Sequence, residues 1–309
     1  MAYTLLQIVD RIAAQIGLAQ PNAVIGSTDP QVIQLRYLLE QLGQDLLKEY
    51  EWQRLVKPYY FTTTPAASGT CNVSSATASL TGFSSVTGIL AGMVVSGPGV
   101  AAYAEVASVD TATKSVVMTY PAVGPSTSSA SVNFITQDYA LPSDWWKEIS
   151  DTNWDRTDHW RNLGPKTSQE WQWLQGGIIS IGPRERYRII GNKLRYFNAP
   201  ASPLNIAYEY VSNSWIIASG GTLPTLSGFA NDADTYIYRD DVMMHGLKYY
   251  WYEAKGLDYS AHYKRFQDAL ASAKAQDQPV AAANLAPWQL PELVGPWSVQ
   301  DGNWPQGSS

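Results

Sequence analysis

The composition of the chain changes abruptly at Pro65 and changes back at Asn133. Between these residues the sequence is mostly Ser, Thr, Ala, Val and Gly, with no Trp and only three charged residues, Glu105, Asp110 and Lys114. Short alternating runs separated by turn-forming residues are typical of a small all-β unit, a barrel or a sandwich. Because strand-like sequence resumes on both sides, we interpret residues 65–133 as a domain inserted into a loop of a host fold, between two strands of one hairpin.

Several short runs within this stretch have the alternation and composition of strands. The turn signals Gly97-Pro-Gly99 and Asp110-Thr-Ala-Thr113 separate them. The expected strands are Ala78–Thr81, Met93–Val95, Ala104–Val109, Ser115–Tyr120 and Ser131–Ile135.

The N-terminal part, residues 1–64, has the pattern of two helices and a strand. Apolar residues recur at helical spacing from Thr4 to Leu18, and Gly17 is suited to end that helix. Asp29 and Pro30 supply an N-cap and a first helical position for a second helix that runs from Gln31 to about Tyr50. Residues 53–64 alternate and are rich in Val, Tyr, Phe and Thr, which predicts a strand.

Residues 134–276 begin with a Trp-rich segment, since six of the twelve Trp lie between Trp145 and Trp173. Pro142 is suited to a helix entry that Ser143 or Asp144 would cap. We expect short helices and strands here, with the strands joined in part by a tight Gly191-Asn192 turn. The expected helices are Trp145–Ser150 and Thr167–Leu174, and the expected strands are Arg186–Ile190, Lys193–Phe197 and Asn205–Tyr210.

A loop is expected over Gly220–Ala230, followed by a long helical region from Asn231 to Gln276 that breaks at Gly256-Leu-Asp258.

Residues 277–309 contain no Lys or Arg and show no apolar periodicity, yet they carry three Trp. Disordered tails usually lack such residues, so we interpret this segment as an extended arm that docks on another surface, in preference to simple disorder. Its expected anchors are Leu285, Trp288, Leu290, Leu293, Trp297 and Trp304.

These patterns together predict an α+β fold: a helical bundle core with a small β-hairpin region, an inserted all-β domain and an extended C-terminal arm. Charged residues make up 16% of the chain, below the usual ~25%. Twelve Trp and nineteen Tyr accompany this deficit. Both features are explained equally by surfaces covered in an assembly and by a large aromatic core.

The charge and cysteine content exclude several classes of protein. A net charge of −6 argues against tight, sequence-independent DNA binding, which requires clustered Lys and Arg. Cys71 is the only cysteine, so a disulfide framework within one chain is excluded. No signal peptide is evident and no apolar run approaches ~18 residues, so we expect a protein made in the cytoplasm without a membrane anchor.

The order of the motifs from Tyr139 to Trp215 resembles the head-to-tail adaptor family, the tail accessory factors of short-tailed double-stranded DNA bacteriophages. The two N-terminal helices and the C-terminal helices fit the same plan. The resemblance covers roughly residues 1–62 and 135–275, and none of its motifs is catalytic. The matching motifs are Leu141-Pro-Ser-Asp144, Asp151-Thr-Asn-Trp-Asp-Arg156, Trp160-Arg-Asn-Leu-Gly-Pro165, Ser168-Gln-Glu-Trp171, Tyr187-Arg-Ile-Ile-Gly-Asn-Lys-Leu194, Phe197-Asn-Ala-Pro200 and Tyr208-Glu-Tyr-Val-Ser212.

The resemblance implies a homo-oligomeric ring, expected to contain twelve copies, at the head-tail junction of a virion. Such a ring lies beneath the portal protein, extends the channel through which genomic DNA passes without sequence-specific binding, and provides the platform for the tail tube or nozzle. The resemblance also implies that the arm at 277–309 grips the portal. The inserted β-unit departs from the smaller family members, and it is either an outer surface that meets tail fibres or other tail proteins, or a spacer.

Enzymatic chemistry has little support in the sequence, and we expect neither an enzyme nor a metal or cofactor site. His159, His245 and His262 each follow an Asp by four residues, a spacing that gives single His–Asp pairs on helices rather than a zinc site.

The alternative function is a virion-associated peptidoglycan hydrolase. Its candidate carboxylates are Asp151, Asp155 and Asp158, which helix capping and pairing with Arg156 and Arg161 explain more simply.

A basic run alternates across the predicted hairpin. Period-two spacing places Arg184, Arg186 and Arg188 on one face, with Arg195 on the second strand. These side chains are interpreted as an inter-subunit contact, as a channel-facing surface, or as a solvated strand face. We favour the inter-subunit contact over the channel, because a basic lumen would retard passing DNA.

Overall fold

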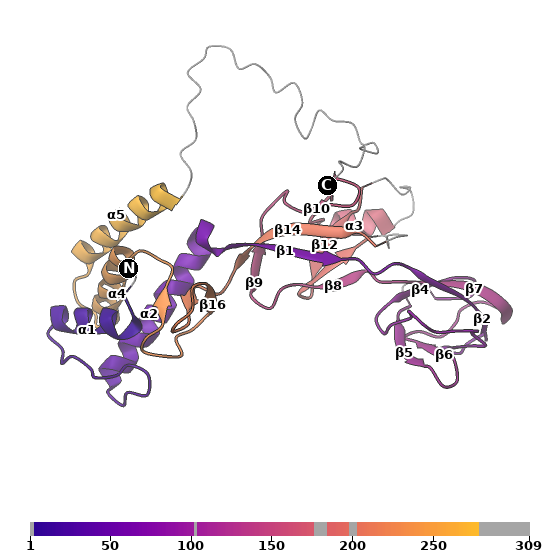
Figure 1. The fold of residues 1–309 in the computed structure, drawn as a ribbon, viewed down its shortest axis with the longest axis horizontal. Coiled ribbons are helices and arrows are strands. Elements are labelled where there is room, and N and C mark those ends of the chain that lie inside the picture. Colours follow the sequence, from indigo (N-terminus) through magenta and orange to yellow (C-terminus); the bar gives the residue numbers. More distant parts are fainter. Residues whose placement is uncertain (1–2, 102–103, 176–183, 198–202, 278–309) are drawn as a thin grey trace, which may run out of the picture. The chain divides into compact units, whose positions relative to one another are not determined.

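A computed structural model describes residues 3–101, 104–175, 184–197 and 203–277. Within these residues the fold is mostly β-sheet, with four antiparallel sheets and five α-helices (Figure 1). The predicted fold class, a helical bundle core with a small β-hairpin region, is therefore wrong. The reason lies in the Trp-rich segment and its flanks, where strand pairing between distant parts of the chain replaces expected helix or loop.

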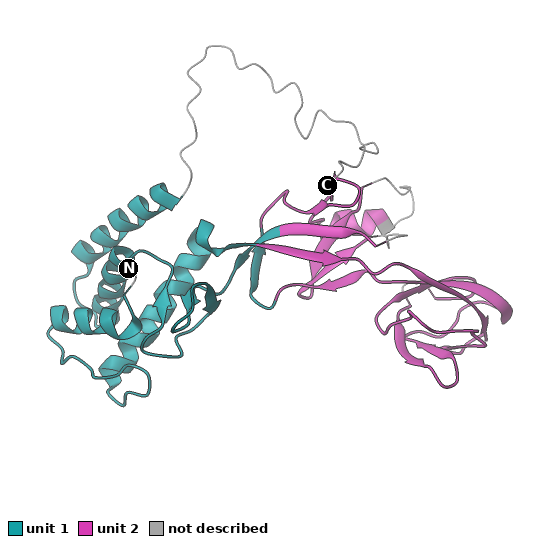
Figure 2. Cartoon of the chain, in the orientation of Figure 1, with its two compact units in different colours: residues 1–57, 143–148, 209–291 teal, residues 58–142, 149–208, 292–309 magenta. Residues whose placement is uncertain are grey.

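The chain divides into two compact units, each assembled from separate stretches of sequence (Figure 2). Unit 1 comprises the described residues within 1–57, 143–148 and 209–291. Unit 2 comprises those within 58–142, 149–208 and 292–309. These units differ from the four segments expected from the sequence, and the four-part division stays a prediction.

Unit 1 contains four helices, and the sequence predicts most of their limits. Thr4 caps α1 through a capping box with Gln7, and Gly17 ends it in the left-handed conformation. Asp29 caps α2 by accepting a hydrogen bond from the N–H of Gln31. The helices are α1 (Leu5–Ile16), α2 (Pro30–Glu49), α4 (Asp240–Ala254) and α5 (Ser260–Asp277).

Trp215 lies at the centre of the unit 1 core and is fully buried. Its ring packs directly on Gly43 of α2, where a Cβ atom would overlap the indole. The rings of Phe229 and Tyr238 lie 5.5 Å and 5.6 Å from it, centroid to centroid. Gly246 of α4 similarly permits close approach to α2. The core is completed by apolar residues of α1, α2 and α4, among them Leu5, Ile8, Ile12, Leu35, Leu39, Leu42, Leu46, Met243 and Leu247.

A five-stranded sheet contains the segment predicted as the helix Trp145–Ser150. Residues 145–148 instead form β9, whose partner is β14, in the register Glu148 to Tyr210. The helix prediction is therefore wrong, because Trp accepts strand geometry readily when a paired strand is present. A 3₁₀ turn, Gln53–Leu55, precedes β1. The strands are β1 (Val56–Thr62), β9 (Trp145–Glu148), β10 (Trp154–Asp155), β11 (Trp160–Arg161) and β14 (Asn205–Ser212).

The polar, Trp-free stretch forms a six-stranded antiparallel sheet with its own core (Figure 1). Phe134 and Phe83 pack together in that core at a centroid distance of 5.8 Å. β1 pairs with β14, so the expected placement between two strands of one hairpin is wrong. The strands are β2 (Ala67–Val73), β3 (Ser79–Thr81), β4 (Val94–Ser96), β5 (Val106–Asp110), β6 (Ser115–Met118) and β7 (Thr127–Ile135).

The predicted tight hairpin is confirmed. Gly191 and Asn192 both have positive φ, +57° and +59°, as a two-residue primed turn requires. The hairpin strands join a third strand in a sheet of unit 2, next to the short helix α3 (Ser168–Gln175), also predicted. The strands are β8 (Asp138–Ala140), β12 (Tyr187–Ile190) and β13 (Lys193–Tyr196).

The segment before α4 differs from its prediction. Asn231 does not begin a helix, because the carboxylate of Asp234 accepts hydrogen bonds from the backbone N–H groups of Ser219, Ala230 and Asn231 and fixes a loop. A small sheet takes up the rest of this region, including part of the expected loop. Its strands are β15 (Ile216–Ile217), β16 (Pro224–Leu226) and β17 (Thr235–Tyr236). The predicted break between α4 and α5 is confirmed.

Candidate functional site

Asp144 joins two distant motifs within unit 1. Its carboxylate accepts hydrogen bonds from Tyr210 Oη at 2.8 Å, Ser212 Oγ at 2.7 Å and Lys57 Nζ at 2.7 Å. Burial works against the charged form of Asp144, but these three hydrogen bonds outweigh it and lower its pKa to about 2. Asp144, expected to cap a helix, therefore connects the Leu141–Asp144 motif to the Tyr208–Ser212 motif as a half-buried structural anion.

A second junction lies in unit 2 and connects two further motifs with Tyr196, which lies just before a third. Asn162 Nδ2 donates to Asn153 Oδ1 at 2.8 Å, and Tyr196 Oη lies 3.4 Å from the same oxygen. All three side chains are almost completely buried. Buried polar groups that satisfy one another fix a single packing arrangement. The motifs that contain these residues therefore specify structure.

The arginine hairpin contains a row of three charged residues across its sheet. Arg188 of β12 lies opposite Arg195 of β13, and Arg195 lies opposite Asp138 of β8. Arg195 donates Nε and Nη2 to Asp138 at 2.5 Å and 2.7 Å. Like charges directly opposite destabilise a sheet, and the bidentate pair with Asp138 offsets that repulsion. Arg195 is thus engaged within its own chain, with Glu105 a further 3.9 Å neighbour.

The other three arginines differ in their surroundings. Arg188 lies over the Trp171 ring, 5.5 Å from its centroid, and its buried Nε has no hydrogen-bond partner among the described residues. Arg186 forms an isolated bridge with Leu163. Arg184 is half-buried just before it. The inter-subunit or channel-facing role of this run stays a prediction.

The ion pair of Arg195 and Asp138 gives a testable stability effect. Replacing Asp138 with Ala leaves Arg195 opposite Arg188 without its partner, and we expect a loss of about 2 kcal/mol in the free energy of unfolding. Chemical denaturation measures the loss. The matched control is Asp151→Asn, which removes the charge of the 3.0 Å pair between Asp151, 68% exposed, and Arg161 and tolerates the positive φ of this position, +65°; it should change stability by at most about 0.5 kcal/mol. Equal effects of the two substitutions would contradict the expectation.

None of the three candidate hydrolase carboxylates lies on a helix: Asp151 precedes β10, Asp155 ends β10, and Asp158 lies in the turn between β10 and β11. Asp155 is 3% exposed and accepts hydrogen bonds from the N–H groups of Thr157 and Asp158 at 2.7 Å and 3.4 Å. Asp158 is exposed, and Asp151 is paired with Arg161. The expected helix capping by these residues is wrong, because no helix begins there, whereas the expected pairing of Asp151 with Arg161 is confirmed.

Glu185 is a titratable residue with a shifted pKa that the sequence did not indicate as a candidate functional residue. Burial raises its pKa to about 7, and the negative charge of Asp155 and then that of Asp158 act in the same direction, against Arg186. Burial also raises the pKa of Asp155. Three carboxylates from two segments therefore interact in unit 2: Asp155 and Asp158 from one, and Glu185 from the other. No local sequence signal marks Glu185, because its burial depends on residues far away in the chain.

The histidines and the cysteine have ordinary surroundings. His245 lies on α4 and His262 on α5, as predicted, whereas His159 lies in the β10–β11 turn. Cys71 is buried, which raises its thiol pKa to about 11. Within the described residues, no group of three or more His, Cys, Asp or Glu side chains is placed to hold a metal ion.

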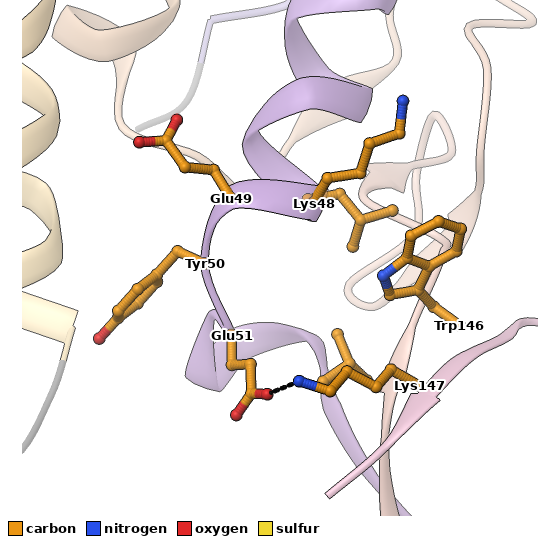
Figure 3. A pocket seen from close by; sticks show the side chains of 8 residues that line it. Lys48, Glu49, Tyr50, Glu51, Trp146 and Lys147 are labelled. Atoms are coloured by element: carbon orange, nitrogen blue, oxygen red, sulfur yellow. Dashed lines mark hydrogen bonds and ion pairs between the residues drawn. The ribbon is translucent and has the colours of Figure 1, made fainter.

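An open hollow of about 310 Å³ lies at the C-terminal end of α2 in unit 1 (Figure 3). Its charged side chains are already paired: Glu51 with Lys147, Glu49 with Lys274 at 2.7 Å, and Lys48 with Asp45 at 3.5 Å. The hollow therefore presents no free charge to a ligand. It is lined by Leu47, Lys48, Glu49, Tyr50, Glu51, Trp146, Lys147 and Val211.

A second cavity, of about 470 Å³, lies in unit 2. Its lining is mainly apolar, and the rings of Trp171 and Phe197 meet edge to face in it at 5.6 Å. Ser96 and Gln137 supply its polar side chains. This composition suits an apolar side chain better than a charged metabolite.

The six predicted portal-docking anchors, Leu285, Trp288, Leu290, Leu293, Trp297 and Trp304, lie outside the described residues. No helix in the described ranges is long and apolar enough to cross a membrane. In comparisons with known proteins, no protein-family model and no curated protein matches the chain.

Proposed function

We propose that this protein is a structural head-to-tail adaptor of a short-tailed bacteriophage, which forms a ring below the portal and carries the tail. In this role the chain is located in the virion and performs no chemistry. Its partners are further copies of the same chain, the portal protein and the proteins of the tail nozzle or tube.

One observation carries the proposal: the motifs that resemble the adaptor family contact one another. In unit 1, Asp144 of one motif binds Tyr210 and Ser212 of another. In unit 2, Asn153 and Asn162 come from two motifs that bond to each other. Motif residues used to lock a framework support a structural role, since catalytic groups must remain open to substrate.

Further contacts between motifs in unit 2 follow the same principle. Tyr196, next to the Phe197–Pro200 motif, reaches Asn153, and Trp171 contacts both Arg188 and Phe197. Aromatic edge-to-face pairs and cation–π contacts of this kind contribute to packing. The resemblance therefore rests on residues that act together in the folded chain and does not depend on isolated matches.

The C-terminal arm gives the direct test of this function. Deleting Ala281–Ser309 should abolish binding to the portal protein, because the deletion removes all six predicted anchors. The mass of the chain, alone and after mixing with portal, measures the effect. We expect the full chain to join the portal as a stoichiometric ring.

The deleted chain should keep the circular dichroism and melting temperature of the full chain, since the described core ends before residue 281. Portal binding that survives the deletion contradicts the arm's role. A full chain that stays free in the presence of portal contradicts the adaptor function.

The alternative function, a peptidoglycan hydrolase, has one supporting observation, the raised pKa of Glu185 beside Asp155 and Asp158. A carboxyl group with a pKa near 7 is suited to general acid catalysis. Asp155, however, is too buried to reach a cell-wall polymer. We expect no clearing of a peptidoglycan gel by the purified chain. Clearing that is lost in Glu185→Gln, but retained in the control Asp151→Asn, would favour the hydrolase.

A further inference from the structure

Four basic side chains gather on one side of the helix pair α4–α5 in unit 1. His245 and Lys248 lie three residues apart on α4, and His262 and Arg265 lie three residues apart on α5. Their charges interact: after burial, Lys248 and Arg265 lower the pKa of both histidines, and Arg265 lowers that of Lys248. We call these four residues the basic face.

The basic face has no neutralising partner among the described residues. Neither Lys248 nor Arg265 makes an ion pair there. The nearby Asp241 is engaged by Arg239 at 2.6 Å and 3.0 Å, and Asp258 accepts hydrogen bonds from Ser260. The net charge of the chain is −6, and this local excess of charge has the opposite sign. Such a surface attracts an anionic partner.

A cluster of tyrosines lies around the same helix pair. The Tyr249 ring lies 5.5 Å from that of Tyr259 and 5.1 Å from that of Tyr263. Tyr259 is 41% exposed and Tyr263 is 44% exposed. Glu253 accepts a hydrogen bond from Tyr249 Oη and has no cationic partner in the described part of the chain. We call Tyr249, Glu253, Tyr259 and Tyr263 the tyrosine face.

The two faces flank α5 on opposite sides. Phe266 marks the buried stripe of this helix. Because each residue turns a helix by ~100°, His262 and Arg265 are rotated from Phe266 in one direction, and Tyr263 is rotated in the other. The ring contact between Tyr252 and His262, at 4.4 Å, lies on the basic side. A single helix pair thus presents two chemically different surfaces.

We infer that the basic face of one copy binds the tyrosine face of a second copy, in a head-to-tail contact. A closed ring requires a heterologous interface, in which two different and complementary surfaces of the same chain meet. Lys248 and Arg265 suit the faces of exposed tyrosine rings, and the carboxylate of Glu253 adds a charge-assisted hydrogen bond. This inference rests on the proposed ring and identifies the surfaces that close it.

Double-stranded DNA is the competing partner for the basic face. It fits less well for two reasons. DNA leaves the exposed tyrosines without a role, and likewise Glu253, which has no cationic partner among the described residues. Two permanent cations per chain also give few phosphate contacts. A second copy uses both surfaces at once.

Two variants, each with one face altered, test the contact. The first carries Lys248→Glu and Arg265→Glu, and the second carries Glu253→Lys and Tyr259→Ser. The matched control is Lys264→Glu, an exposed charge change on α5 that belongs to neither face. Circular dichroism checks that each chain is folded. Sedimentation at high protein concentration gives the mass of each chain alone and of the two variants mixed.

We expect the unaltered chain and the Lys264→Glu control to associate as the concentration rises. Each altered variant alone should stay a monomer, and the equimolar mixture should approach about twice the mass of one chain, because one intact face of each kind remains. A mixture that stays monomeric, or an altered variant that associates like the unaltered chain, overturns the inference. The inference is overturned in favour of DNA if the unaltered chain binds DNA, the first variant no longer binds it, and the association of that variant with itself is unchanged.

Portal mixing separates this inference from the adaptor function. Rings that form on the portal from the first variant would overturn the contact and leave the adaptor role in place. If the two variants pair as expected when mixed but the unaltered chain does not bind the portal, the contact between copies stands and the adaptor function is overturned.

Discussion

Trp215→Ala should lower the free energy of unfolding of unit 1 by about 3–5 kcal/mol, the usual cost of removing a large aromatic side chain from a core. Trp215 is fully buried against Gly43, Phe229 and Tyr238, so its removal leaves a large cavity in a packed core. Hydrogen exchange of α2 and α4 amides measures the loss within unit 1 itself. This choice matters because a chain of two units need not unfold in one step.

Three further variants separate this packing effect from a general loss of Trp. Trp173 is 57% exposed, so Trp173→Ala should change stability by about 0.5 kcal/mol or less. Gly43→Ala places a methyl group in the Trp215 ring and should destabilise by about 1–3 kcal/mol. Combining Gly43→Ala with Trp215→Phe should cost less than the sum of the two. Strict additivity would show that Gly43 and Trp215 are not in contact.

Local signals were sufficient for the elements that depend on their own residues. Thr4, Asp29 and Gly17 set helix ends through capping geometry, and Gly191-Asn192 sets a hairpin through positive φ. These devices act within a few residues, so the sequence alone predicts them. The break between α4 and α5 belongs to the same group.

Elements that depend on distant partners were not predictable in this way. The Trp145–Glu148 segment has no intrinsic pattern that prefers a strand, and the pairing with β14 decides its structure. A helix is predicted from Asn231, but the Asp234 carboxylate accepts hydrogen bonds from three backbone N–H groups and fixes a loop there. The fold-class prediction is wrong for this reason. It rests on the local propensity of short segments, whereas pairing with distant strands determines their structure.

The candidate site shows the same division. The sequence identified the charged residues of the arginine hairpin, but it gave no indication that Asp138 would neutralise Arg195. The sequence does not show that four basic residues lie together. His245, Lys248, His262 and Arg265 form one face only because α4 and α5 pack against each other. Charge in a sequence shows which groups exist, and the fold decides which of them remain uncompensated.

Glu185→Gln should stabilise the protein at pH 8 and have little effect at pH 4, because the folded state holds the Glu185 carboxyl in its neutral form. The pKa is raised from 4.5 to about 7 by burial, assisted by the charges of Asp155 and Asp158. Below pH 4.5 the group is neutral in both the folded and the unfolded chain. Between pH 4.5 and about 7 the unfolded chain ionises while the folded chain keeps its proton, so stability falls across this window and the loss is complete once the folded carboxyl has ionised.

The size of this effect follows from the pKa difference, which corresponds to on the order of 3 kcal/mol when the loss is complete. Urea unfolding at several pH values between 4 and 8 should show the curves of the two proteins diverging as the pH rises. Asp158→Asn is the matched control. It leaves Glu185 in place and removes one exposed negative neighbour, which lowers the pKa of Glu185 in the folded chain; in that background the divergence should be smaller and complete at a lower pH. Parallel curves for Glu185→Gln and the unaltered chain would mean that Glu185 is solvated in the folded protein, and the support for a general acid at this position would disappear with it.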